Sequence, residues 1–172
     1  MIYVNVRAII VKETLTGEEE VLIQRRVKEE ETGKPFELPG GRLEKYESLL
    51  DCLNRELKEE TGLDIERILD PLDKVETVAK DGFKVECMRP FAVYQTIDGP
   101  VDSMGVYFRC KAKGCLLEKG DDTAMIGWVN LERLQSLLEQ DEFSGVDKAG
   151  IEFYLNERNR AHAPSTSCLT QS

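Results

Sequence analysis

Short apolar segments separated by polar turns run along most of the chain, and this pattern predicts a strand-rich domain. Runs dominated by Val, Ile and aromatic residues are typical of strands, whereas clusters of Gly, Pro and Asp mark turns. We expect the first two strands to form a hairpin, and the third and fourth to pair antiparallel across Asp98-Gly99-Pro100. The expected strands are residues 3–11, 21–27, 83–96, 104–112 and 125–129, with a short one at Leu38.

Three segments carry a helical period instead. Residues 47–61 contain neither Gly nor Pro, and their leucines recur at spacings that place them on one stripe of a helix. Ser48 is the expected cap at its start, and Gly62 is expected to end it in a left-handed conformation. Two shorter helices are expected later, each with its capping residue: 131–140 (Asn130) and 148–159 (Asp147).

The length of 172 residues and the apolar content of 41% are typical of one soluble domain with a substantial core. Strands dominate around one long central helix, so we expect an α+β domain built on a mixed sheet. This domain should span residues 1–160. The remaining residues, 161–172, are small and polar, and we expect them to form a disordered tail.

The formal net charge of −10 limits the partners that the chain can bind. Nucleic acids and anionic membranes attract basic surfaces, so we expect neither stable nucleic-acid binding nor membrane association. No apolar run approaches the roughly 18 residues of a membrane span, and residues 1–7 do not resemble a signal peptide. Five cysteines without a C-x-x-C pair favour reduced thiols, and therefore a cytoplasmic protein.

An acidic cluster on the long helix is the strongest chemical signal. Glu56, Glu59 and Glu60 are spaced so that they share one sector beside the leucine stripe. An ordinary solvated helix face could carry the same residues. However, Gly40-Gly41 lets the backbone approach a ligand and Arg55 can brace a carboxylate, which together favour a metal site. Oxygen donors without His or Cys suit Mg²⁺ or Mn²⁺ rather than Zn²⁺.

Residues 41–63 place these features at fixed intervals. They match G-x5-E-x7-R-E-U-x-E-E-x-G-U, where U is a bulky aliphatic residue, at each of its nine constrained positions. The chain therefore resembles the Nudix hydrolases, whose defining motif is this Nudix box. Tyr46 is a departure, because members of the family commonly have Gly there. The matching residues are Gly41, Glu47, Arg55, Glu56, Leu57, Glu59, Glu60, Gly62 and Leu63.

The resemblance implies an α/β/α sandwich in which the box forms a loop-helix-loop beside the mixed sheet. It also implies an enzyme that uses Mg²⁺, or Mn²⁺ as a substitute, to cleave a nucleoside diphosphate linked to another group. In similar proteins the metal is held by groups that correspond here to the Gly40 carbonyl, Glu56, Glu59 and Glu60. Glu47 would brace the box or bind the metal through water, and Gly41 would support the loop. The catalytic base varies among members; we choose Glu59 here, with Arg55 assisting it.

Candidates outside the box each have a structural alternative. Arg25 and Arg26 end a strand near the expected metal loop, where they could bind a substrate phosphate or simply be solvated. Many members carry a Glu shortly before the tryptophan, and Asp121 or Asp122 could replace it or form an acidic turn. The only histidine, His162, lies in the expected tail, which argues against histidine-based catalysis.

The substrate is narrowed mainly by exclusion. The sequence lacks the patterns that mark NADH, ADP-ribose and diadenosine polyphosphate hydrolases of this family. We therefore expect a MutT-like enzyme that converts a (deoxy)nucleoside triphosphate to the monophosphate and pyrophosphate, with Phe91 or Tyr107 stacking on the base. The alternatives are an ADP-ribose or sugar-nucleotide pyrophosphatase, or a nucleotide-binding module without catalysis. A homodimer stays open.

Overall fold

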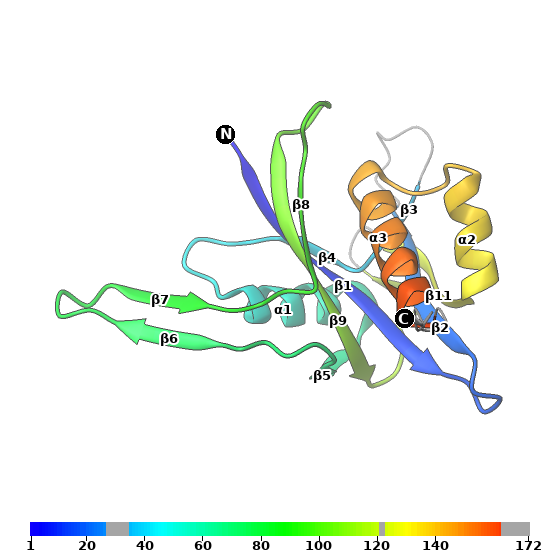
Figure 1. The fold of residues 1–172 in the computed structure, drawn as a ribbon, viewed down its shortest axis with the longest axis horizontal. Coiled ribbons are helices and arrows are strands. Elements are labelled where there is room, and N and C mark those ends of the chain that lie inside the picture. Colours follow the sequence, from blue (N-terminus) through cyan, green and yellow to red (C-terminus); the bar gives the residue numbers. More distant parts are fainter. Residues whose placement is uncertain (27–34, 121–122, 163–172) are drawn as a thin grey trace, which may run out of the picture.

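The structure, a computed structural model, describes residues 1–26, 35–120 and 123–162. Nine strands form one mixed sheet, whose main path runs β10-β11-β2-β1-β9-β5, while β3, β4 and β8 pair with β2, β1 and β9 (Figure 1). The strands of this sheet are β1 (Tyr3–Glu13), β2 (Glu19–Arg26), β3 (Phe36–Glu37), β4 (Gly40–Arg42), β5 (Asp64–Ile68), β8 (Ala92–Gln95), β9 (Ser103–Lys113), β10 (Lys119–Gly120) and β11 (Thr123–Asn130).

The parallel pair β1–β9 forms the centre of the sheet, and its register runs from Tyr3 opposite Ser103 to Ile10 opposite Cys110. Successive side chains of a strand point to opposite faces, and residues 6–11 are all buried because both faces are covered. Arg7 is the charged exception within this run, with 8% of its surface exposed. The predicted β1–β2 hairpin is confirmed, since Val11 pairs with Val21 and Glu13 with Glu19.

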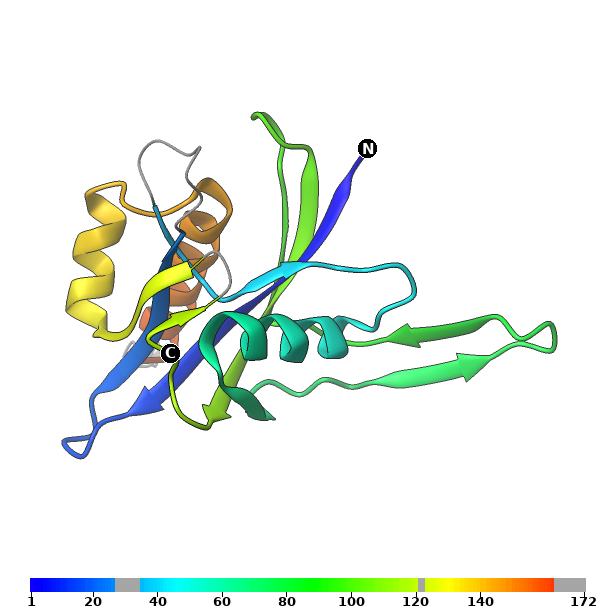
Figure 2. The same ribbon diagram turned by 180° about the vertical axis from the view of Figure 1, so that it is seen from behind.

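The three helices lie on the two faces of the sheet, so the predicted α/β/α sandwich is confirmed (Figures 1 and 2). α1 (Leu49–Thr61) packs with Leu53 and Leu57 against Val6 and Leu22 on one face. α2 (Leu131–Glu139) and α3 (Gly145–His162) cover the other face, where Leu134 and Ile151 join Ile9 and Ile23. None of the helices in the described ranges is long and apolar enough to span a membrane.

The helix ends agree with the sequence in α1 and α2 but not in α3. Ser48 caps α1 and Asn130 caps α2, as predicted. Asp147 was expected to cap the last helix, and this is wrong: α3 begins at Gly145, and Asp147 lies in its first turn with no exposed surface. Its carboxylate lies 3.7 Å from the Arg7 guanidinium, so this side chain serves an ion pair inside the fold. The expected tail at residues 161–172 is wrong for its first two residues, which form the end of α3, and residues 163–172 lie outside the described residues.

The predicted strand at residues 83–96 is wrong, because the structure divides it in two. β7 (Lys84–Cys87) ends before Arg89-Pro90, and β8 starts at Ala92. Proline has no backbone N–H to donate, so it interrupts strand pairing. β7 instead pairs with β6 (Val75–Val78) in a separate two-stranded sheet, which extends away from the rest of the molecule (Figures 1 and 2).

Candidate active site

α1 holds the acidic residues of the box in place. The hydroxyl of Ser48 accepts a hydrogen bond from the Asp51 backbone N–H at 3.1 Å, which satisfies one of the free donors at the helix start. At the other end, Gly62 has a φ of 78°, a left-handed conformation in which its N–H donates to the Lys58 carbonyl. Because the apolar stripe is buried on the sheet, the position of the helix fixes where its glutamates emerge.

Gly40 and Gly41, at the start of the box, bring backbone and side chains unusually close. Gly40 has a φ of 140°, and a Cβ there would lie 2.2 Å from the Val6 carbonyl oxygen. A Cβ on Gly41 would lie 2.3 Å from Cδ of Glu56. Neither position accepts a larger residue without rearrangement. The glycines therefore let β4 pass directly beneath the Glu56 carboxylate.

Glu60 points inward from the end of α1. Its Oε2 accepts hydrogen bonds from Gln24 Nε2 at 2.8 Å and from the Gly40 N–H at 2.9 Å. Burial raises the pKa of this carboxyl group to about 7, although both hydrogen bonds and the charge of Arg7 act in the opposite direction. A buried carboxylate with such a pKa binds either a proton or a cation.

Arg55 organises the opposite side of the acidic cluster. It makes a bidentate pair with Glu47, at 2.8 and 2.9 Å, and also donates to Glu56 at 2.7 Å and to Glu59 at 3.4 Å. The hydrogen bond from Arg55 is the main cause that lowers the pKa of Glu47 to about 2. Planar guanidinium groups suit this fork-like arrangement. Arg55 thus neutralises part of the negative charge that the box concentrates.

In this arrangement Glu56 and Glu59 turn toward Arg55, whereas Glu60 turns toward Gln24. Within the described ranges, no three Asp, Glu, His or Cys side chains converge on one point. The donor set nevertheless fits a hard divalent cation, since it consists of carboxylates from one helix beside a backbone loop, with Glu60 buried. To gather around such an ion, the Glu56 and Glu59 side chains would rotate away from Arg55.

Arg7 links the acidic cluster to a cavity that the sequence did not indicate. Its Nη1 donates to the Gly40 carbonyl at 2.6 Å and to the Leu38 carbonyl at 3.2 Å. Arg7 also lines a cavity of about 560 Å³, together with Glu37, Arg42, Tyr94 and residues 97–101. The guanidinium of Arg42 stacks on the Tyr3 ring at 3.6 Å, at the same cavity. The Gly40 carbonyl, an expected metal ligand, is therefore already hydrogen-bonded.

Several other candidates are not brought to this cluster. Arg25 lies on the α2–α3 side of the sheet, over the Phe36 ring at 4.0 Å and 3.3 Å from Glu142. Arg26 ends β2 opposite Thr123, but its side chain is outside the described part of the chain, as are Asp121 and Asp122. Tyr46 is exposed and has a φ of 63°, a conformation that glycine adopts more readily.

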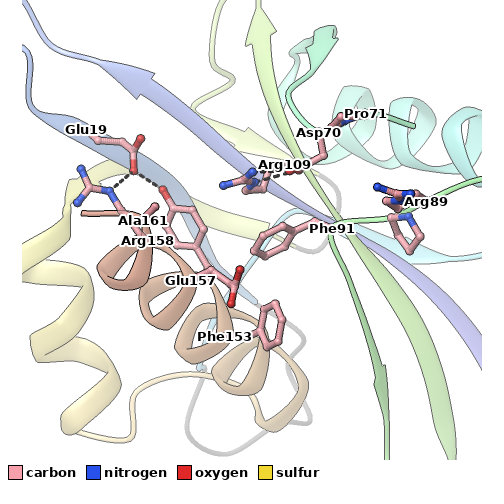
Figure 3. Close-up of a pocket in the computed structure, with 12 residues that line it drawn as sticks. Glu19, Asp70, Pro71, Arg89, Phe91, Arg109, Phe153, Glu157, Arg158 and Ala161 are labelled. Atoms are coloured by element: carbon pink, nitrogen blue, oxygen red, sulfur yellow. Dashed lines mark hydrogen bonds and ion pairs between the residues drawn. The ribbon is translucent and has the colours of Figure 1, made fainter. Parts of the chain in front are cut away.

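The expected aromatic stacking partners are also placed elsewhere. Tyr107 is only 1% exposed and its hydroxyl donates to the Val146 carbonyl, so its ring cannot stack on a base. Phe91 lines a different cavity, on the α3 side of the sheet (Figure 3). The expectation that one of these rings holds the base is therefore wrong for Tyr107. Phe91 does not reach the cavity beside Arg7.

Comparison with known proteins identifies the class of this site. Residues 4–147 match the model of the NUDIX domain, which covers most of the chain. The glycine loop and the capped helix that carries Arg55 and three glutamates lie within this match. The chain belongs to the Nudix family.

Individual relatives support the same fold. A zebrafish (Danio rerio) protein, "8-oxo-dGDP phosphatase NUDT18", is 41% identical over 64 residues, which are 37% of this chain and 19% of that protein. This chain thus spans about a fifth of that curated relative. The E. coli ORF135 protein is 18% identical with a TM-score of 0.60, and the match covers 95% of both chains. A Francisella tularensis bifunctional NMN adenylyltransferase/ADP ribose pyrophosphatase, complexed with AMP and a Mn ion, is 20% identical with a TM-score of 0.61; the match covers 91% of this chain and 42% of that one.

Sequence reasoning missed Gln24 and Arg7. Gln24 follows Leu22 on the α1 face of β2, so strict alternation along the strand would have selected Gln24, and not Arg25, as the residue that meets the helix. For Arg7, the available signal was a charged residue within an apolar strand. Buried charges are rare unless they are paired, and such a residue deserves consideration beside any motif.

Proposed function

We propose that this protein hydrolyses the pyrophosphate linkage of a nucleotide with Mg²⁺, or Mn²⁺ as a substitute. The ion would be held by Glu56, Glu59 and Glu60 together with the Gly40 carbonyl. The observation that carries this proposal is the Glu60 carboxylate, buried between Gln24 and Gly40 beside Glu56, where burial raises its pKa to about 7. A carboxylate whose negative charge is destabilised by burial, despite two hydrogen bonds, favours cation binding.

The residues of the box have different roles in the proposed hydrolysis. A bound divalent ion supplies an electrophile that neutralises phosphate oxygens and makes water easier to deprotonate. Glu59 is the carboxylate that we assign as the base, because its side chain is 47% exposed and so is open to water. Arg55 holds Glu59 by one hydrogen bond and releases it when the carboxylates gather. Glu47 remains bound to Arg55 and keeps its guanidinium in place.

The cavity beside Arg7 is the site that we propose for the nucleotide. Its volume of about 560 Å³ is within the usual range for small-molecule sites. Arg7 and Arg42 supply positive charge for a phosphate chain, and Tyr94 supplies an aromatic wall. We propose a (deoxy)nucleoside triphosphate as the substrate, cut between the α and β phosphates. The zebrafish relative named for 8-oxo-dGDP makes a purine nucleotide a sensible first test.

Product analysis in ¹⁸O-labelled water tests this proposal. Purified protein is incubated with Mg²⁺ and a panel of nucleoside triphosphates, nucleoside diphosphates, ADP-ribose and a sugar nucleotide. We expect triphosphates to give labelled monophosphate and unlabelled pyrophosphate, or the reverse if the β phosphorus is attacked. Cleavage of ADP-ribose or of the sugar nucleotide alone would replace the substrate assignment but keep the enzyme.

The remaining alternative is a nucleotide-binding module without catalysis. Calorimetric titration with the same panel separates the two, because a module binds a nucleotide that it leaves intact. Glu60→Gln is the control, since it keeps the shape of the site but lacks the charge. Binding without turnover in wild type, unchanged in Glu60→Gln, would favour the module.

A further inference from the structure

The hairpin of β6 and β7 has one apolar face and one charged face, and the apolar face is exposed. We call residues 75–87 the arm. Cross-strand partners share a face of a sheet, so the register places one set of side chains on an apolar face: Val75, Thr77, Ala79, Phe83, Val85 and Cys87. The other set forms a charged face: Glu76, Val78, Lys84 and Glu86. A sheet normally buries its apolar face on its own core, yet Val75 is 58% exposed and Phe83 is 69% exposed.

The charged face makes the contact between the arm and α1. Glu86 accepts a hydrogen bond from the Leu49 N–H at the start of α1, at 3.2 Å. Lys74 and Lys84 link Glu76 and Glu86 at distances of 2.8 to 3.7 Å. A shift of one residue in the pairing would exchange the two faces, and these contacts oppose it. The apolar face therefore points away from α1, toward the side of the sheet on which α3 lies.

A cavity of about 520 Å³ opens at the root of the arm on this α3 side (Figure 3). Arg89 and Pro90, which follow β7, form part of its wall, and α3 contributes Phe153. Four of its charged groups pair with one another, Arg109 with Asp70 and Arg158 with Glu19. The other two, Arg89 and Glu157, pair with Asp73 and Arg160 outside its lining. The rings of Phe91 and Phe153 lie edge to face at 5.5 Å and form an aromatic part of the cavity wall.

We propose that the arm is the dimerisation element of this protein, and that a second copy of the chain covers its apolar face. The two arms would pack antiparallel about a two-fold axis. In that arrangement the tip of each arm, which carries Phe83, lies over the root of the other. Phe83 would enter this cavity of the second copy and pack against the contacting rings of Phe91 and Phe153. Such an interface is self-complementary, as two-fold symmetry requires.

Several observations favour a second copy as the occupant. The arm carries Lys80 and Lys84 against Glu76, Asp81 and Glu86, with Lys74 next to it, so it is nearly neutral within a chain of net charge −10. Two arms can approach without the repulsion that the rest of the surface would cause. The net negative charge of the whole chain disfavours nucleic acid and anionic membrane as partners. A two-stranded hairpin alone is only marginally stable in water, and a partner would stabilise it.

The apolar face of the arm is small for a stable interface, so the proposed dimer also requires the cavity. Seven residues of a strand extend about 23 Å and two strands are about 10 Å wide, so the apolar face offers only some 200 Å² of outline. Each partner in a stable complex typically buries about 800 Å². Insertion of an aromatic side chain into a cavity adds buried area at both ends of the interface, and aromatic anchors commonly dominate binding.

Sedimentation velocity across a wide concentration range tests the proposal, with variants matched by face. Val75→Lys changes the apolar face, and Val78→Lys changes the charged face of the same strand at a similar exposure, 58% against 68%. We expect wild type and Val78→Lys to dimerise alike, and Val75→Lys to weaken dimerisation at least about tenfold. Phe83→Ser should weaken it similarly.

Phe153→Lys tests the cavity without touching the arm, because Phe153 lies on α3. It should also weaken the dimer at least about tenfold, and melting curves confirm that each variant is folded. A wild-type protein that stays monomeric at every concentration overturns the proposal. So does a dimer that Val78→Lys disrupts as strongly as Val75→Lys, or one that Phe153→Lys leaves unchanged.

Discussion

Glu47 and Glu60 occupy the two ends of the Nudix box and have opposite environments. Glu47 accepts two hydrogen bonds from Arg55, which hold its pKa near 2. Glu60 is buried against Gln24 and Gly40, and its pKa rises to about 7. The same residue type therefore carries a charge that Arg55 stabilises at one end of the motif and a charge that burial destabilises at the other. The two environments therefore lie before and at the end of α1, within one motif.

The largest effect is expected for Glu60→Gln, which removes the carboxylate charge that burial destabilises. We expect turnover to fall roughly 100- to 1,000-fold, as when a key transition-state stabiliser is removed. In the absence of divalent metal, the melting temperature should rise, because the neutral amide costs less to bury. Steady-state kinetics and calorimetry measure the two effects, with the exposed Glu66→Gln as control. A variant that is less stable without metal would contradict the assigned environment of Glu60.

Gly41→Ala disturbs the close approach of β4 to the Glu56 carboxylate. The new Cβ would meet the Glu56 carboxylate at 2.3 Å, whereas Gly127 has nothing within 4 Å of the same position. We expect Gly41→Ala to lower turnover roughly tenfold or more, because the Glu56 carboxylate must move, and the free energy of unfolding by only about 1 kcal/mol, because that carboxylate ends a flexible side chain. Denaturant unfolding and kinetics check both values. Equal effects in Gly127→Ala would show that steric contact with Glu56 is not the cause.

Arg55→Lys tests the pair that stabilises the Glu47 charge. Lysine cannot reproduce the bidentate pair with Glu47, so the free energy of unfolding should fall by about 1–2 kcal/mol at pH 7. The folded pKa of Glu47 lies below its unfolded value of 4.5, so its stabilisation is present above pH 4.5 and is lost as the pH falls toward 2. The difference between wild type and variant should therefore shrink over this window in urea unfolding curves. A constant difference would argue against the Glu47 pair.

The pH dependence of the stability of metal-free wild type tests the environment of Glu60 and has the smallest expected effect. The folded pKa of Glu60 lies above its unfolded value of 4.5, so the folded state binds the proton more strongly. Stability should rise as the pH falls from 8 through 7 toward 5. Millimolar Mg²⁺ should raise the melting temperature at pH 8 and remove this trend, since it binds the ionised carboxylate. Glu60→Gln serves as the control without the titrating group.

The features that the sequence predicted well are those that depend on near neighbours. The long helix, its caps at Ser48 and Gly62, and the placement of Glu56 and Glu59 follow from spacings within one or two turns. Arg7 and Gln24 were missed because their roles depend on β1 meeting β4 and on β2 meeting α1. Arg89-Pro90 carried a readable signal for a strand break, and the arm itself became visible only when β7 paired back with β6.

The parallel pairing of β1 with β9 has a consequence for how the protein folds. Tyr3 meets Ser103 and Ile10 meets Cys110, so the central pair joins residues about a hundred positions apart in the chain. Closing such a long loop costs entropy before any contact repays it, and folding rates fall as the contacts become more distant in sequence. During synthesis, α1 leaves the ribosome long before β9 exists. The first strand must then wait for its central neighbour, and this interval is when the exposed apolar residues of β1 are most open to aggregation.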